Sequence, residues 1–270
     1  MLERERMSVN KNELKILCRI AEAAGQEIMA IYRDGGETWQ KDDASPLTEA
    51  DLCADRVIRQ GLESNFPTVF ILSEESVSQG QQTKRFFLVD PLDGTKEFLK
   101  RNGEFTVNIA LVEDGRAVAG VVFAPALNEL FYAAKGVGAW KRDSTGERPI
   151  ATSAHDPTRP LRVMGSRSHG GDKLLTWLTT LKNEHTLVAI GSSLKFCRIA
   201  EGSADIYPRL GPTSQWDTAA AQAILEVAGG AVINLQGEPL RYGLDRPVLN
   251  PEFIASSKAG LSAISESFAP

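Results

Sequence analysis

Apolar residues recur every three or four positions in two stretches near the start of the chain, which predicts two amphipathic helices. Their apolar faces are formed by Leu14, Leu17, Ala21, Ala24, Ile28 and Ile31 in the first helix and by Ala54, Ile58 and Leu62 in the second. Asp34-Gly35-Gly36 is expected to end the first helix, and Thr48 is a suitable N-cap for the second. Asp51 falls in the first turn of the second helix, where an acid commonly interacts with the helix dipole, so its position alone leaves both a capping and a catalytic role open.

Shorter apolar runs predict strands in the rest of the first half. They cover residues 69–72, 85–89, 105–112, 117–123 and 129–134. Asp114-Gly115, between two of these runs, is a strong hairpin signal. Successive strands joined in this way predict a large antiparallel sheet, covered on one side by the two helices.

The second half alternates strands and helices, an α/β pattern with polar loops at strand ends, where ligands commonly bind. Strands are expected at residues 161–164, 186–190 and 204–207, and helices at residues 172–181 and 218–227. A further helix is expected to follow the loop 191–195 and to end at residue 201. A polar segment over residues 142–159 predicts the joint between two lobes. We therefore expect an N-terminal α+β lobe, residues 1–148, and a C-terminal α/β lobe, residues 149–270.

The composition excludes several classes of protein. Of the 270 residues, 42% are hydrophobic and 24% are charged, which is ordinary for a soluble globular enzyme. The net charge of −5 argues against a nucleic-acid polymer as partner, since such binders need a basic face. Cys18, Cys53 and Cys197 form no CxxC pair, so neither a disulfide framework nor a thiolate zinc site is indicated, and a reducing cytoplasm is expected. No apolar run approaches the ~20 residues of a membrane span.

The stretch that begins at Asp90 carries the first chemical signal. It follows an apolar run, so Asp90 and Asp93 are expected just past the end of a strand. Pro91 would stiffen the turn between the two acids, and Gly94 would let the backbone approach a ligand. The acids can bind a hard divalent cation, and the N–H groups between Gly94 and Lys96 can bind a phosphate beside it. By itself such a stretch is more often a surface turn, because Asp, Pro and Gly are common turn residues.

Further acids stand where strands and helices begin or end. Glu74 follows an expected strand, and Asp217 begins an alanine-rich helix, where simple capping is again the commoner role. Gathered together, Glu74, Asp90, Asp93 and Asp217 would repel one another unless cations bind among them. An all-oxygen donor set favours Mg²⁺ over Zn²⁺. Two such ions about 3.5–4 Å apart clamp a phosphate ester and activate a water, which indicates phosphoryl chemistry.

These motifs together resemble the inositol monophosphatase superfamily of lithium-sensitive, magnesium-dependent phosphatases. The matching segments are Asp51, Glu74-Glu75, Asp90-Pro91-Leu92-Asp93-Gly94-Thr95 and Trp216-Asp217-Thr218-Ala219-Ala220, in the order and approximate spacing of that superfamily. Within this superfamily, residues 96–110, 191–197 and 207–213 are similar to the corresponding segments of bacterial 3'(2'),5'-bisphosphate nucleotidases. The resemblance implies a layered α/β fold, the αβαβα sandwich of the inositol monophosphatase and fructose-bisphosphatase type.

The resemblance also implies the roles of individual residues. The ligands of two or three Mg²⁺ ions would be Glu74, Asp90, Asp93, Asp217 and the main-chain carbonyl of Leu92. Thr95 and Asp51 would orient and deprotonate the attacking water, with Glu75 at most in a supporting position. Substrate contacts would come from Glu74, Leu92, Asp93, Gly94, Thr95 and Asp217 as well.

By the same resemblance the substrate would be 3'-phosphoadenosine 5'-phosphate, cut to AMP and phosphate as part of sulfur metabolism, and 3'-phosphoadenylyl sulfate is a second candidate. Lys195 and Arg209 would bind the phosphate that is not cut, since Arg forks onto phosphate oxygens and Lys acts as a point charge. Ser166 and His169 would contact the nucleoside, and Gly191 would lie beside the substrate. Each of these residues is also compatible with an ordinary loop or solvated position. A cytoplasmic enzyme, with peripheral association at the inner membrane, is expected on this basis.

Two other functions stay open. One is an inositol or sugar monophosphatase of the same superfamily, because charge alone does not separate an adenosine bisphosphate from an inositol phosphate. The other is a non-catalytic regulatory protein that binds metal and nucleotide. Against the second, Asp51 and Thr95 would serve no purpose in a protein that only binds. Both a monomer and a homodimer fit the sequence.

Overall fold

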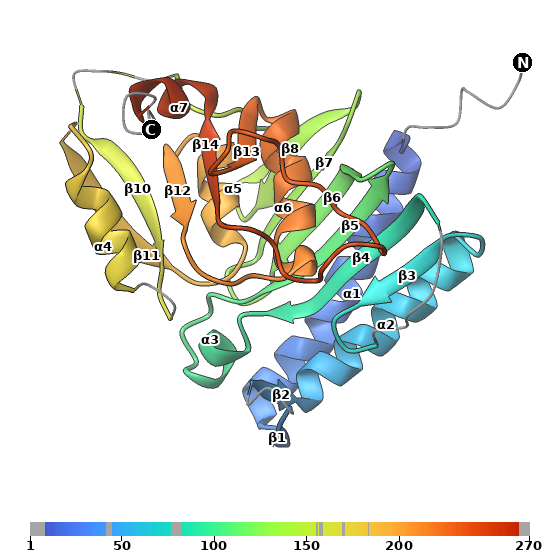
Figure 1. Cartoon of the computed structure of the whole chain (residues 1–270). Helices are drawn as coiled ribbons and strands as arrows, with labels where there is room; N and C mark the ends of the chain where they lie inside the picture. Colours follow the sequence, from blue (N-terminus) through green and yellow to red (C-terminus); the bar gives the residue numbers. More distant parts are fainter. Residues whose placement is uncertain are drawn as a thin grey trace, which may run out of the picture.

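The chain folds into alternating layers of helices and sheets, shown in Figure 1 for the computed structural model. The structure describes residues 9–41, 45–76, 83–154, 156, 159–168, 171–182 and 184–264. From one side to the other, the layers are two long helices, a seven-stranded sheet, two further helices, a five-stranded sheet and a last pair of helices. The expected αβαβα sandwich is confirmed.

The larger sheet is a nearly continuous meander. Its strands, in spatial order, are β3 (Phe70–Ser73), β4 (Arg85–Asp93), β5 (Thr106–Glu113), β6 (Arg116–Ala124), β7 (Glu129–Ala134), β8 (Gly138–Asp143) and β9 (Gly146–Pro149). All neighbours are antiparallel except β3 and β4, which are parallel. The hairpin at Asp114-Gly115 is confirmed, and both residues have positive φ (47° and 77°), as a tight strand connection of this kind requires.

Helices α1 (Lys11–Asp34) and α2 (Glu49–Asn65) cover one face of this sheet (Figure 1). As predicted, α1 ends at Asp34 with Gly35 as its C-cap, and α2 begins after its N-cap Thr48. Between them a two-stranded ribbon pairs β1 (Thr38–Gln40) with β2 (Pro46–Thr48). The buried faces of both helices form one core with alternate residues of the strands, among them Phe87, Val107 and Val121.

The other face of the sheet carries the intervening residues, such as Leu88, Ala110 and Val122, and packs against a middle layer of helices. That layer consists of α5 (Leu194–Ala200) and α6 (Gln215–Val227), which are almost wholly buried. A short helix, α3 (Thr95–Leu99), follows β4 at the edge of the sheet. Because successive side chains of a strand point to opposite faces, Asp90 and Asn108 belong to the face that α5 and α6 cover.

The smaller sheet lies on the far side of α5 and α6. Its order is β11 (His185–Ile190), β10 (Leu161–Ser166), β12 (Ile206–Arg209), β14 (Phe253–Ser257) and β13 (Gly230–Asn234). Helices α4 (Asp172–Thr179) and α7 (Lys258–Ile264) pack on its outer face. The sequence prediction missed β13 and the interior strand β14, whose Phe253 and Ala255 face the same core as α5 and α6. No described helix is both long and apolar enough to cross a membrane.

Two predictions about residues 85–159 were wrong. The polar segment 142–159 is not all a joint, because its first part lies in the hairpin of β8 and β9. The outer strand, β9, is exposed along its whole length, which explains its polar sequence. Asp90 and Asp93 do not lie past the end of a strand either, because β4 continues to Asp93. The boundary between residues 148 and 149 stays a prediction.

The reason for the longer strand is a β-bulge. Asp90 pairs with Asn108 and Asp93 with Thr106, so four residues of β4 face three of β5. Pro91 sits in this irregular stretch, where its missing N–H breaks no regular ladder bond. Gly94 follows with φ of 94° and leads directly into α3. Asn108 and Thr106 are two residues apart on β5, so their side chains share one face, and the bulge therefore brings Asp93 to the same face of the sheet as Asp90.

Candidate functional site: an acid cluster and two buried cations at one cavity

Glu74 and Asp90 come together because β3 and β4 are parallel. Parallel strands end at the same edge of a sheet, and the N–H of Glu74, just after β3, donates to the carbonyl of Val89 on β4 at 3.1 Å. The adjacent Asp90 is only 2% exposed and belongs to the face that α6 covers.

Asp217 reaches the same place from α6, more than a hundred residues later. It is the third residue of that helix, and its Oδ2 accepts the backbone N–H of the N-cap Ser214 at 2.9 Å, closing a capping box. The capping role weighed from the sequence is therefore real, but it uses only one oxygen. One carboxylate oxygen each of Glu74, Asp90 and Asp217 lie within 4.8 Å of one another.

Asp93 lies beside this trio and is held by an asparagine. The Nδ2 atom of Asn108 lies 3.3 Å from Asp93 Oδ2 and 3.0 Å from Ser193 Oγ. Ser193 in turn donates to the carbonyl of Asp217 at 2.5 Å. The sequence analysis missed Asn108 and Ser193, although a fully buried amide within the apolar run of β5 was a usable signal.

The electrostatics of the cluster are unfavourable without a cation. Burial, and then repulsion from Glu74, Asp93 and Asp217, raise the pKa of Asp90 well above its ordinary value. Burial and the charge of Asp93 likewise raise the pKa of Asp217 to about 8. Clustered carboxylates offer only oxygen donors, so the residues present fit a hard divalent cation such as Mg²⁺.

Lys41 is a further member of the site that the sequence analysis did not predict. Its Nζ lies 2.7 Å from Glu74 Oε1 and 2.7 Å from Glu75 Oε1. Burial opposes the charge of Lys41, yet the two acids outweigh it and raise its pKa. Burial also raises the pKa of Glu75 to about 7. Glu75 therefore contacts Lys41 rather than the acid trio.

Asp51 and Thr95 form a hydrogen-bonded pair next to the cluster. Thr95 Oγ1 lies 3.3 Å from Asp51 Oδ1 and 3.4 Å from the carbonyl of Leu92. The other carboxylate oxygen of Asp51 accepts the backbone N–H and the hydroxyl of Thr48, a capping box like that of Asp217. Burial raises the pKa of Asp51, although the hydrogen bonds from Thr48 counteract it. Asp51 therefore combines a structural bond with one oxygen directed at Thr95.

A cavity of about 250 Å³ opens beside these groups. The residues expected from the sequence that line it are Glu74, Asp90, Leu92, Asp93, Gly94, Thr95, Ser166, Gly191, Lys195, Arg209 and Asp217. His169, expected to contact a nucleoside, lies outside the described residues.

Two buried cations, on α5 and β12, also line the cavity. Lys195 is 6% exposed; its Nζ donates to the carbonyl of Ser192, approaches that of Ile190 at 3.4 Å and lies 5.3 Å from the centre of the Tyr207 ring. Burial lowers the pKa of Lys195 to about 8. Arg209 is 8% exposed, and within the described structure its Nε has no hydrogen-bond partner. Buried donors of this kind suit an anion.

Comparison with known proteins assigns the family. The model of the inositol monophosphatase family matches residues 10–267. The chain belongs to this family. Every segment that carried the resemblance in the sequence falls inside the matched range, including the acids of β4 and of α6.

Two relatives and two solved structures place the chain more finely within the inositol monophosphatase family. The 3'(2'),5'-bisphosphate nucleotidase CysQ of Salmonella typhimurium is 48% identical over 246 residues, 89% of this chain and 98% of that protein, and the CysQ of Escherichia coli K12 is 47% identical over the same shares. A crystal structure of CysQ from Bacteroides thetaiotaomicron superposes with a TM-score of 0.82 at 37% identity, over 92% and 98% of the two chains. The structure of an inositol monophosphatase from Anabaena superposes with a TM-score of 0.77 at 27% identity, over 95% of each chain.

Proposed function

We propose that this member of the inositol monophosphatase family is a Mg²⁺-dependent 3'(2'),5'-bisphosphate nucleotidase. It removes the 3'-phosphate of 3'-phosphoadenosine 5'-phosphate and yields AMP and phosphate; the same site accommodates 3'-phosphoadenylyl sulfate. The observation that carries the proposal is the partly buried acid cluster at one cavity with two buried cations, Lys195 and Arg209. The names of the CysQ relatives support the same activity.

The acids divide into groups that hold metal and a pair that moves a proton. Glu74, Asp90, Asp93, Asp217 and the carbonyl of Leu92 would hold two or three Mg²⁺ ions. The bound metal supplies positive charge, which makes a nearby water more acidic and neutralises charge on the phosphate. With metal bound, Asp90 and Asp217 would be carboxylates. Their raised pKa values favour protonation of the empty site, and the positive charge of the metal would take the place of those protons.

Thr95 and Asp51 form the proton path. The Thr95 hydroxyl donates to Asp51 and keeps its lone pairs free to accept a hydrogen bond from water. A proton lost by that water passes to the carboxylate, whose raised pKa suits a base that must accept it. Thr48 holds the other oxygen of Asp51, so the carboxylate cannot turn away.

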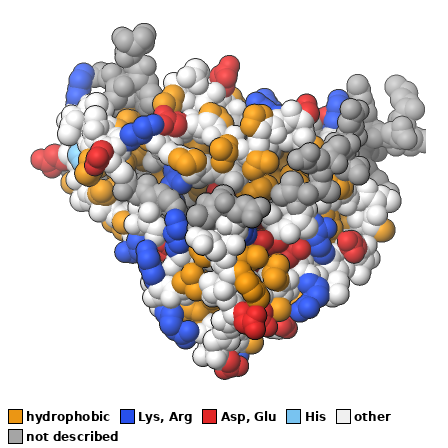
Figure 2. Space-filling view, turned by 60° about the horizontal axis from the view of Figure 1, so that its bottom comes forward, with side chains coloured by type: hydrophobic (Ala, Val, Ile, Leu, Met, Phe, Trp, Pro, Cys, Tyr) orange, Lys and Arg blue, Asp and Glu red, His pale blue; other side chains and the backbone are white. Residues whose placement is uncertain are grey.

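Lys195 and Arg209 would bind the phosphate that is not cut, and Ser166 the nucleoside. The unpartnered Nε of Arg209 gives one donor for phosphate, and Lys195 adds a charge with little exposure to solvent. On the face shown in Figure 2, described basic and acidic side chains are interspersed, which supports a small anionic substrate over a nucleic-acid polymer. All three cysteines are free, which supports the proposed cytoplasmic location. Peripheral association with the inner membrane stays a prediction.

A panel of phosphate esters assayed with Mg²⁺, with and without Li⁺, tests this function. We expect the adenosine bisphosphate to be cut preferentially and Li⁺ to inhibit. Lys195→Ala should raise KM for the bisphosphate far more than for a monophosphate. Equal effects on both would favour an inositol or sugar monophosphatase, and no phosphate release from any ester would favour a protein that only binds.

A further inference from the structure

Glu104, in the loop between α3 and β5, joins the first lobe to two loops of the second. Its Oε2 lies 2.7 Å from the backbone nitrogen of Gly191, just after β11. The guanidinium of Arg167, just after β10, binds both carboxylate oxygens at 2.6 Å each. Arg167 also donates to the carbonyl of Ala189 at 2.7 Å. One carboxylate therefore holds the ends of two neighbouring parallel strands.

The backbone around Glu104 is packed closely against both sides of the cavity. A Cβ on Gly191 would lie 2.6 Å from the carbonyl oxygen of Glu104, and one on Gly94 would lie 3.2 Å from the same atom. Such distances leave room only for glycine at position 191. Glu104 thus lies between the turn at Gly94, which follows the acids of β4, and the loop that leads to Lys195.

A second contact ties the same parts together. Ser168 donates to Glu97 and lies 3.0 Å from the Nζ of Lys100, both on or next to α3. Ser166, which lines the cavity, is two residues away from Ser168. The α3 region therefore fixes the end of β10 at two points, Arg167 and Ser168.

A short chain of contacts connects Glu104 to Lys195. The Nζ of Lys195 donates hydrogen bonds to the carbonyls of Ile190 and Ser192, the residues on either side of Gly191. Glu104 holds the Gly191 N–H between them. Within the described residues Glu104 does not itself line the cavity. Burial opposes its charge, but the bonds from Arg167 and Gly191 prevail and lower its pKa, so it is a carboxylate throughout the neutral range.

We propose that Glu104 is a positioning residue that sets the preference for a doubly phosphorylated substrate, by holding the Gly191 loop in the place where Lys195 meets the uncut phosphate. This inference rests on the proposed bisphosphate nucleotidase function. It makes selectivity depend on a residue of the first lobe that touches neither substrate nor metal. Arg167 is its partner in this role, because it spans from Glu104 to the carbonyl of Ala189 on β11.

The test compares adenosine 3',5'-bisphosphate with adenosine 3'-monophosphate, which has the same bond to be cut but lacks the second phosphate. Glu104→Ala should raise KM for the bisphosphate about tenfold and change its kcat by less than about twofold, because one charge-assisted contact behind the phosphate site is lost. Both constants for the monophosphate should stay within about twofold of wild type. Calorimetric binding of AMP, which keeps the uncut phosphate, should weaken by a similar factor.

Further variants separate positioning from simple stabilisation. Glu104→Gln keeps an acceptor for the Gly191 N–H but loses the charge that Arg167 needs, so its KM should lie between those of wild type and Glu104→Ala. Arg167→Ala and the double variant complete a cycle, in which the two effects on KM should be less than additive. Glu22→Ala is the matched control, since it removes an ion pair of 2.6 Å with Arg142 away from the cavity. It should leave both substrates unchanged.

The outcomes discriminate between the inference and the function on which it rests. If the wild type cuts the bisphosphate no better than the monophosphate, the proposed function and this inference both fall. If the wild type prefers the bisphosphate and Glu104→Ala keeps that preference, or lowers kcat for both esters alike, only the role of Glu104 is overturned. Should Glu104→Ala fail to fold, Glu104→Gln and Arg167→Ala decide by the same ratio.

Discussion

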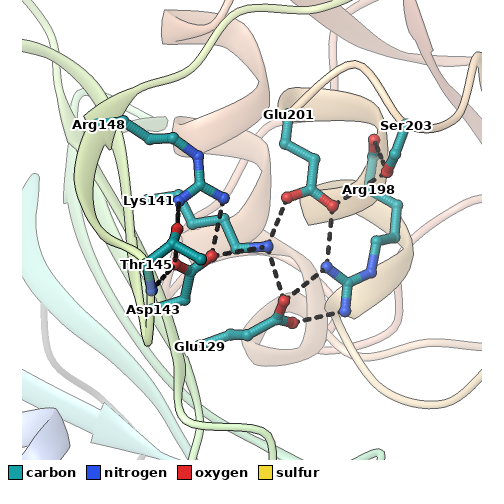
Figure 3. A network of polar contacts seen from close by, with 8 residues as sticks. All are labelled: Glu129, Lys141, Asp143, Thr145, Arg148, Arg198, Glu201 and Ser203. Atoms are coloured by element: carbon teal, nitrogen blue, oxygen red, sulfur yellow. Dashed lines mark hydrogen bonds and ion pairs between the residues drawn. The ribbon is translucent and has the colours of Figure 1, made fainter.

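Two clusters of charged residues in this protein treat their acids in opposite ways. One is the acid cluster of Glu74, Asp90, Asp93 and Asp217 at the N-terminal end of α6. The other, which we call the α5 network, is shown in Figure 3 and consists of Glu129, Lys141, Asp143, Arg148, Arg198 and Glu201 with their hydroxyl neighbours Thr145 and Ser203. Both lie between elements that are distant in sequence.

In the α5 network every acid meets a base. Lys141 Nζ, on β8, lies 2.6 Å from Glu129 and 2.7 Å from Glu201, and Arg198 on α5 bonds the same two acids. Burial would raise the pKa of Glu129, but the hydrogen bonds from Arg198 and Lys141 outweigh it and lower that pKa. The network fastens the end of α5 to the large sheet (Figure 3).

In the acid cluster the pKa values move the other way, upward for Asp90, Asp93 and Asp217. Within the described residues the Lys41 ammonium group pairs with Glu74 and Glu75 rather than with these three aspartates. The charge of Lys195 lowers the pKa of Asp93 without cancelling the effect of burial. The comparison teaches that a buried acid marks structure when a base is built beside it, and marks a binding site when the fold leaves its charge uncompensated. The following predictions break or sharpen this contrast.

The largest effect should come from the acid cluster. Asp217→Asn keeps the size of the side chain but removes the charge, and we expect kcat for phosphate release to fall by about 10³-fold or more, since metal stabilisation of the transition state is worth several kcal/mol. Steady-state kinetics with saturating Mg²⁺ measures it. Retention of wild-type kcat would show that Asp217 is only a helix cap.

Breaking the α5 network should cost stability and leave catalysis intact. Lys141→Met leaves Glu129 and Glu201 with one base fewer in a site where the lysine side chain is 6% exposed. We expect the free energy of unfolding to fall by about 2 kcal/mol, because two partly buried acids each lose one base and keep only Arg198. Urea denaturation measures this change. A loss of kcat comparable to that of Asp217→Asn, in protein that is still folded, would contradict the division of roles.

Mg²⁺ should stabilise the fold through the acid cluster alone. At about a hundred times its Kd the ion should add about 2.7 kcal/mol to the free energy of unfolding, seen as a higher Tm in a calorimetric scan. Lys141→Met should gain as much as wild type, whereas Asp217→Asn should gain much less. An equal gain in all three proteins would place the ion elsewhere.

The smallest effect should be the pH dependence of substrate affinity. Burial lowers the pKa of Lys195 to about 8, so the side chain is charged below that pH and neutral above it. KM for the bisphosphate should therefore rise about tenfold between pH 7 and pH 9, while Lys195→Arg, which stays charged, should flatten the profile. A rise of the same size in Lys195→Arg would assign the titration to another group.

Much of the fold was accessible from local patterns. The stripes of α1 and α2, the Thr48 cap and the Asp114-Gly115 hairpin were predicted correctly, because each depends on residues within a few positions of one another. The failures have the opposite origin. β14 is a central strand whose pairing with β12 joins residues far apart in the chain, and the bulge at Asp90 exists only through its pairing with β5.

The sequence by itself determined which acids, bases and hydroxyls were present and which elements carry them, since periodicity and capping are local properties. It also indicated an oxygen-donor metal site and, by resemblance, the residues that would form it. Only the tertiary structure decided that Glu74, Asp90 and Asp217 meet, that Asn108 and Ser193 support them, and that Lys195 and Arg209 are buried at the same cavity. The physical reason is that burial and charge compensation depend on which distant segments pack together. The acid at position 129 lies between two bases, whereas the acid at position 90 lies among other acids.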